Sequence, residues 1–454
     1  MSQTIKIKKG LNLNLAGTAE KKISETIKSE TYAVKPSDFL GLQRPKLLVE
    51  EGATVKAGTP VFFDKKQEKV MFCSPVSGEV VEVIRGEKRK LLEIRILADK
   101  EISYQEFETP DVSEIGSLSL EKAKELMLSS GVWISIIQRP FGVVANPEEK
   151  PKSIFISGFD THPLAPDYNI LFKDQEKYFQ TGVDILKKFT SGKVHLSLDG
   201  NADTQSIFSQ IKNVEIHKFS GPHPAGNVGT QIHEIDPINK GEIVWTLHPF
   251  GVIQIGKLFH HGKYDASKVI ALAGSEVKTP QYYRLHTGTN ISKLIENNLK
   301  QDHVRVISGN VLTGERINKD GFIGFYHNMI TVIPEGDEPR FLGWVLPAVG
   351  RPSMHRVVNI WSFLNGKKPL APDTNTNGEP RAFVQTGVFE KVVPLDILPT
   401  YLIKAIMAED YDEMESLGIY EVIEEDLALC EFVDVSKHNI QAILREGLDL
   451  LKNS

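Results

Sequence analysis

The sequence contains very little cysteine. Among its 454 residues only Cys73 and Cys430 are cysteines. An iron–sulfur cluster needs about four thiolates, and so does a four-cysteine zinc site. The chain therefore has too few cysteines for either group, and a disulfide is not expected in a reducing cytoplasm.

Long apolar runs and an excess of basic charge are also missing. No stretch approaches the ~18 uninterrupted apolar residues that a membrane-spanning helix needs. The first nine residues lack the apolar centre of a signal peptide and alternate like a strand. The net charge of -6 argues against nucleic acid as the main partner, because phosphate binding needs a clustered basic face. We therefore expect a cytoplasmic protein with no transmembrane segment.

The composition is that of a globular protein with several domains. It is 41% hydrophobic and 25% charged, and domains average roughly 150 residues. The pattern predicts an α/β multidomain protein. We divide it into a β-rich module (1–105), a Rossmann-like α/β domain (106–256), a small grasp-type β domain (257–330) and a C-terminal region, largely helical at its end (331–454).

The β-rich module is similar to a biotinyl or lipoyl carrier domain of the barrel-sandwich type. Gly52 and Gly58 suit tight turns, and the hairpin Ser74–Gly78 has the Ser-Pro-Val-Ser-Gly sequence found near such carrier sites. Counting back from this hairpin places Gln67 where the modified lysine of those families stands. Gln67 cannot carry biotin or lipoate, so we expect a scaffold or docking role. A slip of one residue would place Lys66 there instead.

Periodicity predicts the elements of the later domains. Helices are expected at Leu120–Met127 and Asp174–Lys188, and on the apolar faces of residues 397–406 and 440–451. Thr289 or Asn290 is expected to cap a further helix that carries Ile291 and Leu294. Strands are expected at Ser153–Ser157, Val194–Leu198, Val214–Phe219 and Glu242–Leu247, and Lys268–Ala273 opens the next section of the chain.

A loop rich in glycine and histidine follows the strand that ends at Phe219. Its glycines, Gly221, Gly226 and Gly229, match neither the dinucleotide fingerprint nor a P-loop. Such a loop lets backbone N–H groups approach an anion or a planar ring, with His223 beside them. The alternative is a structural turn whose path is set by its prolines.

A second candidate is an apolar segment that contains Trp133, Arg139 and Phe141, and His162 follows the next strand. An apolar pocket with a few polar groups suits a quinone head, and strand ends are where α/β sheets bind ligands. The alternative is that Trp133–Ile137 is a buried strand.

The histidines considered as ligands are scattered, so we expect no metal site. They are His162, His223, His233, His248, His260 and His261. No nucleophile with a matching base is found either, and no residue is expected to be catalytic.

Taken in order along the chain, these pieces resemble the NqrA family, which belongs to sodium-translocating NADH:quinone reductases. The resemblance rests on the carrier-like hairpin and on the segments Ile5–Leu13, Phe155–Leu164, Phe219–Gly226 and Leu429–Val433. That family is similar in plan to RnfC and to the flavin- and NADH-binding subunit of complex I. The resemblance implies a barrel-sandwich hybrid, a Rossmann-like domain, an SLBB-like β-grasp domain and a helical end.

The resemblance also implies partners and a location. The partners would be the five other subunits, NqrB to NqrF, and especially the membrane subunit NqrB. This protein would lie on the cytoplasmic side of the inner membrane as a peripheral subunit. The complex oxidises NADH, reduces quinone and exports sodium, with its flavins and iron–sulfur centre on other subunits. This chain is then expected to bind no cofactor tightly.

Quinone contact by this chain is a hypothesis within that scheme. Its candidate residues are Trp133, Arg139, Phe141, His162, Gly221, His223, Gly226 and Gly229. Cys430 resembles the end of a ferredoxin-type signature in which Asp434 and Val435 replace the second cysteine and the proline. The alternative is a buried structural cysteine. The alternative function is a stand-alone α/β oxidoreductase that binds a flavin or nucleotide at His223–Thr230. A carrier modified at Lys66 is a third interpretation.

Overall fold

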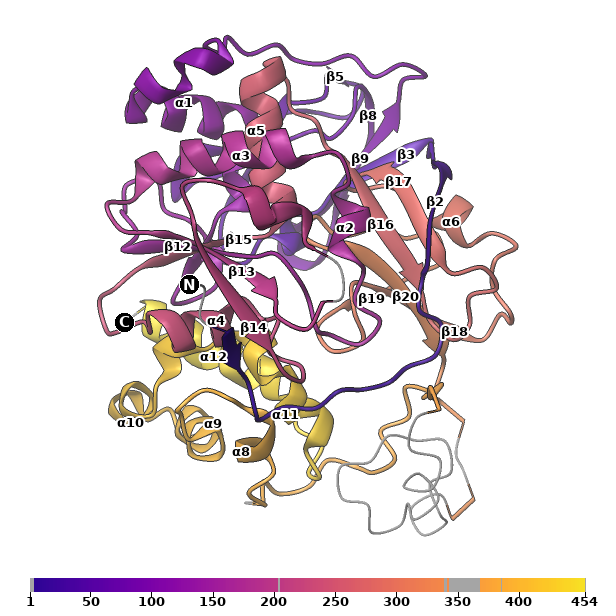
Figure 1. Cartoon of the computed structure of the whole chain (residues 1–454). Coiled ribbons are helices and arrows are strands. Elements are labelled where there is room, and N and C mark those ends of the chain that lie inside the picture. Colours follow the sequence, from indigo (N-terminus) through magenta and orange to yellow (C-terminus); the bar gives the residue numbers. More distant parts are fainter. Residues whose placement is uncertain (1–3, 203–204, 339–340, 343–367, 385, 454) are drawn as a thin grey trace.

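The structure is a computed structural model that describes residues 4–202, 205–338, 341–342, 368–384 and 386–453. In these residues the strands form sheets of seven, six, four and three strands, followed by a C-terminal group of helices (Figure 1). The predicted fold class, α/β with a β-rich module and a helical end, is confirmed.

The seven-stranded sheet is the centre of the α/β domain, in the order β1-β14-β13-β12-β15-β10-β11. β1, β14, β13, β12 and β15 run parallel, whereas β10 is antiparallel to both of its neighbours. The strands are β1 (Thr4–Lys6), β10 (Ile137–Arg139), β11 (Val143–Val144), β12 (Ser153–Ser157), β13 (Val194–Asp199), β14 (Glu215–Ser220) and β15 (Val244–Leu247). The four strands predicted here are confirmed with small shifts at their ends.

Helices cover both faces of this sheet, because alternate residues of its strands are apolar on opposite sides. Ile154 and Ile156 of β12 belong to the main core with α3 (Glu176–Leu186) and α5 (Pro249–His261). Phe155, between them, packs with Ile232 of α4 (Val228–Ile235) on the other face. Figure 1 shows α3 and α5 on one side and α4 with the C-terminal helices on the other.

The two predicted helices of this domain are confirmed. α1 (Leu120–Ser130) begins where the pattern predicts and continues three residues further, to a left-handed Gly131. α3 lies inside the predicted Asp174–Lys188. The short α2 (Tyr168–Leu171) precedes α3.

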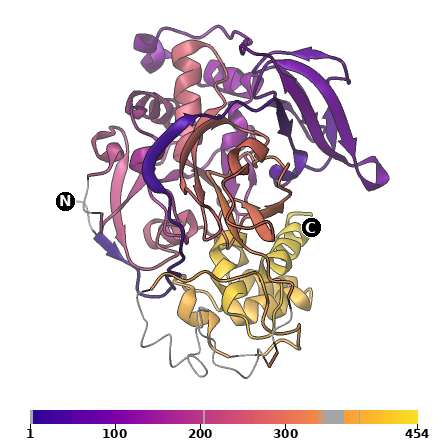
Figure 2. The ribbon, with the colours of Figure 1, turned by 90° about the vertical axis from the view of Figure 1, so that its right-hand side faces the viewer.

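The strands at the N-terminus do not join the barrel-sandwich sheets. β1 pairs with β14, and β2 (Glu20–Thr26) pairs in parallel with β17 of the six-stranded sheet. Figure 2 shows this indigo segment running between the two sheets. Alternation along the N-terminus therefore predicts a strand but not the strand that it pairs with. The domain borders themselves remain predictions.

Two small sheets form the barrel-sandwich module, in the orders β3-β9-β8-β5 and β4-β6-β7. Phe62 and Phe72 stack at its centre with ring centroids 4.5 Å apart. The hairpin between β6 and β7 places Lys66 at its exposed tip, and Gln67 is the first residue of β7. The strands are β3 (Thr31–Val34), β4 (Pro45–Leu47), β5 (Thr54–Val55), β6 (Pro60–Asp64), β7 (Gln67–Cys73), β8 (Gly78–Arg85) and β9 (Leu91–Ala98).

The six-stranded sheet has the order β19-β18-β20-β16-β17-β2 and packs around α6 (Ser292–Ile295). The predicted cap of this helix is wrong by at least one residue. Ile291 is the N-cap, and Asn290 instead accepts a hydrogen bond from the Ser292 N–H at 3.0 Å. The strands are β16 (Ser267–Ala273), β17 (Gln281–His286), β18 (Val304–Ser308), β19 (Glu315–Ile317) and β20 (Met329–Pro334).

The C-terminal helices have a separate apolar core, and both predicted apolar helix faces contribute to it. They are α8 (Phe389–Val392), α9 (Pro399–Met407), α10 (Tyr411–Ser416), α11 (Ala428–Val433) and α12 (Ile440–Asn453). Short 3-10 helices occur at η1 (Pro36–Asp38), η2 (Glu87–Arg89), η3 (Val112–Ser117), η4 (Val132–Ser135), η5 (Lys187–Phe189), η6 (Ile207–Gln210), η7 (Ile419–Glu421) and η8 (Glu424–Leu427). Within the described ranges, no helix is both long enough and apolar enough to cross a bilayer.

Candidate functional site

Two loops meet at the carboxyl ends of β12 and β14. The Thr161 hydroxyl lies 3.1 Å from Nδ1 of His223 and accepts a hydrogen bond from the Gly226 N–H at 2.9 Å. A Cβ on Gly226 would lie 2.6 Å from the Thr161 nitrogen, so only glycine allows this approach. The chain passes from β12 outward to β14 and then returns to β15 on the other side of β12. Loops at such a reversal of strand order are where open α/β sheets bind ligands.

The glycine–histidine loop is also fastened to the N-terminal segment. Gly221 has φ +139°, and a Cβ there would lie 2.3 Å from the Ile7 carbonyl oxygen. The backbone N–H of His223 donates to Oδ1 of Asn12 at 2.9 Å, and the Leu11 N–H donates to the His223 carbonyl at 2.8 Å. These contacts hold the loop against the N-terminal segment, as expected for a structural turn.

Asp160 and His162 form an ion pair beside this turn, with Oδ2 and Nε2 3.1 Å apart. Burial raises the pKa of Asp160, but His162 outweighs burial and lowers this pKa to about 2. Burial also lowers the pKa of His162, and the Asp160 charge more than offsets this effect, so the pKa is raised. The pKa of His223 is lowered to about 4, because burial disfavours the imidazolium form. His223 is therefore neutral at pH 7.

The C-terminal region supplies the other charges of this site. Arg139, whose side chain is 1% exposed, donates from Nη1 to Oδ2 of the fully buried Asp426 and from Nη2 to Oε1 of Glu425, both at 2.6 Å. Burial lowers the pKa of Arg139, but the two carboxylates outweigh burial and raise this pKa. Arg139 therefore links β10 to η8 by a buried ion pair.

Asp426 also lies against the first turn of α4. A Cβ on Gly229 would lie 2.2 Å from Oδ1 of Asp426, so the carboxylate occupies the space a side chain would need. Asn227, the N-cap of α4, donates from Nδ2 to the Glu425 carbonyl at 3.0 Å. The amino end of a helix attracts negative charge. Here a carboxylate of the chain itself supplies it.

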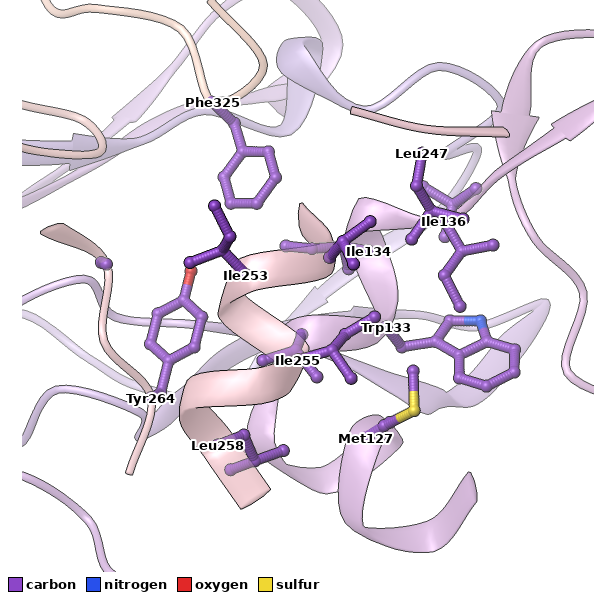
Figure 3. Packing of buried hydrophobic residues seen from close by; sticks show 14 of the residues in the cluster. Met127, Trp133, Ile134, Ile136, Leu247, Ile253, Ile255, Leu258, Tyr264 and Phe325 are labelled. Carbon is purple, nitrogen blue, oxygen red and sulfur yellow. The ribbon is translucent and has the colours of Figure 1, made fainter. Parts of the chain in front are cut away.

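Trp133 lies in the core of the domain, at 0% exposure (Figure 3). Its indole N–H donates to the Ala145 carbonyl at 2.8 Å, and its ring packs edge-on against Trp245. The alternative hypothesis was a buried strand from Trp133 to Ile137. It is correct that Trp133 is buried, but it is wrong about the backbone conformation. Residues 132–135 form η4, because the left-handed Gly131 turns the chain tightly after α1, and β10 starts at Ile137.

The remaining candidate, Phe141, contacts the C-terminal region. Its ring meets Tyr420 edge-on with centroids 6.1 Å apart, and its carbonyl accepts from Nη1 of Arg445 at 2.8 Å. The structure thus gathers His162, His223 and Gly226 around Asp160 and Thr161, and it brings Arg139 and Gly229 to Asp426. Trp133 and Gly221 lie in structural contacts.

Sequence reasoning missed Glu425 and Asp426. Asp426 is 287 positions from Arg139, and both acidic residues stand in a run that is typical of a solvated helix face. Nothing local in the sequence signals that Asp426 is buried.

Both cysteines are buried, and burial raises the pKa of each thiol. Asp434, which takes the place of the second cysteine of a ferredoxin-type signature, accepts from the N–H groups of Ser436 at 3.0 Å and His438 at 2.8 Å. Asp434 therefore stabilises the turn after α11.

Three domain-family models match the sequence of this chain. They are described as the NqrA N-terminal barrel-sandwich hybrid domain (residues 5–99), the NqrA second alpha/beta domain (118–264) and the NQRA C-terminal domain (269–319). The NqrA protein of Haemophilus influenzae, from its Na(+)-translocating NADH-quinone reductase, is 39% identical over 453 residues, which cover 99% of both chains. The chain belongs to the NqrA family.

Other NqrA relatives show the same extent of similarity. The NqrA of Pasteurella multocida is 38% identical over 451 residues, and that of Neisseria meningitidis is 37% identical over 449, each covering 99% of both chains. A solved NAD+-reducing [NiFe]-hydrogenase aligns with 52% of the chain, and with 52% of its own chain, at 9% identity. Its TM-score of 0.36 is too low to support an inference.

Proposed function

We propose that this chain is the NqrA subunit of a sodium-translocating NADH:quinone reductase. The proposal depends on one observation, which is the end-to-end similarity to proteins that carry this name. We assign it a peripheral position on the cytoplasmic face of the inner membrane, bound to NqrB and the other subunits NqrC to NqrF.

Within that complex we assign a docking and supporting role to this protein. The amino end of α4, where a nucleotide phosphate would bind, lies against Asp426 of the same chain. The barrel-sandwich hairpin has Gln67 at the counted carrier position. Two buried cysteines are too few to hold an iron–sulfur cluster, so we assign that centre to another subunit. We also assign the flavins to other subunits, as the resemblance to the NqrA family implies.

The test is to remove the chain from its own cells and restore it with an affinity tag. We expect the deletion to abolish sodium-dependent NADH:quinone reductase activity in membranes and the tagged chain to restore it. We also expect the tag to purify NqrB and the other subunits from solubilised membranes. Activity that survives the deletion, or a tagged chain that purifies alone, would contradict the proposal.

We further propose that quinone contacts this chain only in the assembled complex, where Phe141 and the loops carrying His162 and His223 meet the C-terminal region. Contact through Trp133 would require opening of the core. A photoactivatable quinone applied to the whole complex should label peptides of residues 139–164 or 219–229, and excess quinone should suppress the labelling. Absence of label from this chain would exclude the contact.

The alternatives make different predictions. A stand-alone flavin enzyme would be yellow when purified and would show a flavin absorbance band. A carrier at Lys66, whose exposed position at the hairpin tip suits modification, would show the added mass of biotin or lipoate. We expect a colourless chain of unmodified mass.

A further inference from the structure

Three potential metal ligands lie together on β13 and β14, away from the site described above. The two strands are parallel and pair His195 with Glu215. His217 is two residues after Glu215 and therefore lies on the same face of the sheet. The group lies toward the amino ends of these strands, whereas the loops of His162 and His223 leave from carboxyl ends.

The spacing of the three ligand atoms suits one small cation. Nδ1 of His195 is 3.0 Å from Nε2 of His217 and 3.7 Å from Oε2 of Glu215, and all three atoms lie within 4.8 Å of one another. In a tetrahedral zinc site with bonds of about 2.0–2.1 Å, ligand atoms are roughly 3.3–3.4 Å apart. The two distances lie on either side of that value, and the three atoms are within reach of one ion once the hydrogen bond between the two imidazoles is given up.

We propose that His195, Glu215 and His217 form a binding site for a divalent transition metal of the zinc type. Two imidazoles and one carboxylate are a ligand set that Zn²⁺ accepts, with a water molecule in the fourth position. This inference does not depend on the proposed function, because it concerns the isolated chain.

The histidines are held in place and available as ligands. The His195 side chain is 5% exposed and its ring stacks on Phe155 with centroids 4.5 Å apart. The Glu215 side chain is 43% exposed, which leaves a path for the ion from solvent.

Lys193 competes with the metal for Glu215. Its ammonium group pairs with Oε1 of Glu215, while Oε2 faces His195. The Lys193 side chain is 63% exposed, so it can swing into water when an ion binds. Replacing Lys193 by an uncharged residue should therefore tighten metal binding. If His195 and His217 had only a structural role, replacing Lys193 would not tighten metal binding.

The experiment uses the purified full chain, freed of metal by a chelator and titrated with Co²⁺ and then Zn²⁺. We expect one Co²⁺ per chain, the visible absorption of four-coordinate cobalt, and its loss when Zn²⁺ displaces it. His217→Gln and Glu215→Gln should each weaken binding roughly tenfold or more, a loss of about 1.4 kcal/mol. Lys193→Gln should strengthen it.

His303→Gln is the matched control. His303 also pairs with a carboxylate, Asp337, at 3.2 Å, but it is exposed and belongs to no three-ligand group among the described residues. This variant should bind metal like the unmodified chain. Circular dichroism of every variant checks that it is folded.

Two outcomes would overturn the proposal. One is the absence of stoichiometric binding by the unmodified chain. The other is equal binding by the unmodified chain and the folded His217→Gln and Glu215→Gln variants, since the ion would then lie elsewhere. A zinc-dependent rise in the thermal midpoint, lost in His217→Gln, would support the site independently of the spectrum.

Discussion

Two groups of histidines lie at opposite ends of the strands of one sheet, and they differ in what covers them. At the carboxyl ends, His162 and His223 are less than 10% exposed and lie among the buried contacts of two loops. At the amino ends, His195 is also buried, but its partners His217 and Glu215 reach solvent. The first group is engaged with the chain itself, and the second can still accept a ligand.

The difference shows that a favourable place in the fold is not enough to make a binding site. The carboxyl ends are where an α/β sheet binds ligands, yet here the C-terminal region brings Asp426 to the amino end of α4. The negative charge that this position attracts is already present. A ligand there would have to displace a buried ion pair, whereas a metal at the amino ends of β13 and β14 displaces an exposed lysine and replaces the hydrogen bond between His195 and His217.

The largest effect is expected from breaking the buried pair of Arg139 and Asp426. Asp426→Asn leaves the Arg139 charge buried without its main partner, and such losses cost about 3–5 kcal/mol. Urea unfolding followed by circular dichroism measures the change. Glu30→Gln is the control, because the side chains of the Lys293–Glu30 pair are 46% and 79% exposed and its loss should change stability little. Equal effects of the two variants would contradict the comparison.

Acid should destabilise the chain through its buried neutral histidines. The pKa of His223 and that of His248 are lowered to about 4, mainly by burial. In the unfolded chain these groups bind protons near pH 6.5, so stability is full above that pH and is lost as the pH falls toward 4. For each histidine this loss of stability amounts to about 3 kcal/mol. The Asp160–His162 pair acts differently, since the raised pKa of His162 adds stability that is lost as the pH rises.

His223→Asn tests this pH dependence. The variant should show a shallower fall of the free energy of unfolding between pH 6.5 and 4, whatever its stability at pH 7. A slope that is the same in the variant and in the unmodified chain would mean that His223 is not held neutral.

Gly229→Ala tests the contact between α4 and Asp426. The added Cβ would lie 2.2 Å from a carboxylate oxygen, so α4 and η8 must move apart. Overpacking of this kind costs about 1–3 kcal/mol. Gly116→Ala is the control, because a Cβ there meets nothing within 4 Å. Thermal unfolding of the two variants should differ in midpoint, with the lower value for Gly229→Ala.

The smallest effect on stability is expected for His217, near the amino ends of β13 and β14. Without metal, His217→Gln should change stability by less than about 1 kcal/mol, because a half-exposed hydrogen bond is largely replaced by water. With zinc at a hundred times its dissociation constant, the unmodified chain should gain about 2.7 kcal/mol that the variant lacks. Unfolding with and without zinc gives both numbers. A large loss of stability in His217→Gln without metal would contradict the comparison, because the group at the amino ends would then be as fully engaged with the chain as the group at the carboxyl ends.

Much of the fold could be predicted because its signals are local. β12 lies at the predicted Ser153–Ser157, and α1 and α3 lie at the predicted helical patterns. Hydrophobic alternation and helical spacing can be recognised from the few residues that make up each element. The strand character of the N-terminus was equally visible, but its pairing with β14 was not.

The candidate site was less predictable. The sequence singled out His162, His223 and the three glycines, and the structure shows that Gly221, Gly226 and Gly229 each allow a close approach. The partners that make these approaches, Ile7, Thr161 and Asp426, come from three different segments. No spacing along the chain relates them, because the contacts form only when the segments pack.

By itself the sequence determined the fold class, the resemblance to the NqrA family and the shortage of thiols for an iron–sulfur cluster. These follow from composition and from patterns over short distances. Only the tertiary structure decided that Asp426 faces the amino end of α4, that β1 and β2 join different sheets, and that His195 meets His217. Those outcomes depend on register and burial between distant segments, and burial decides whether a charge or a ring is satisfied by the chain or remains open to a ligand.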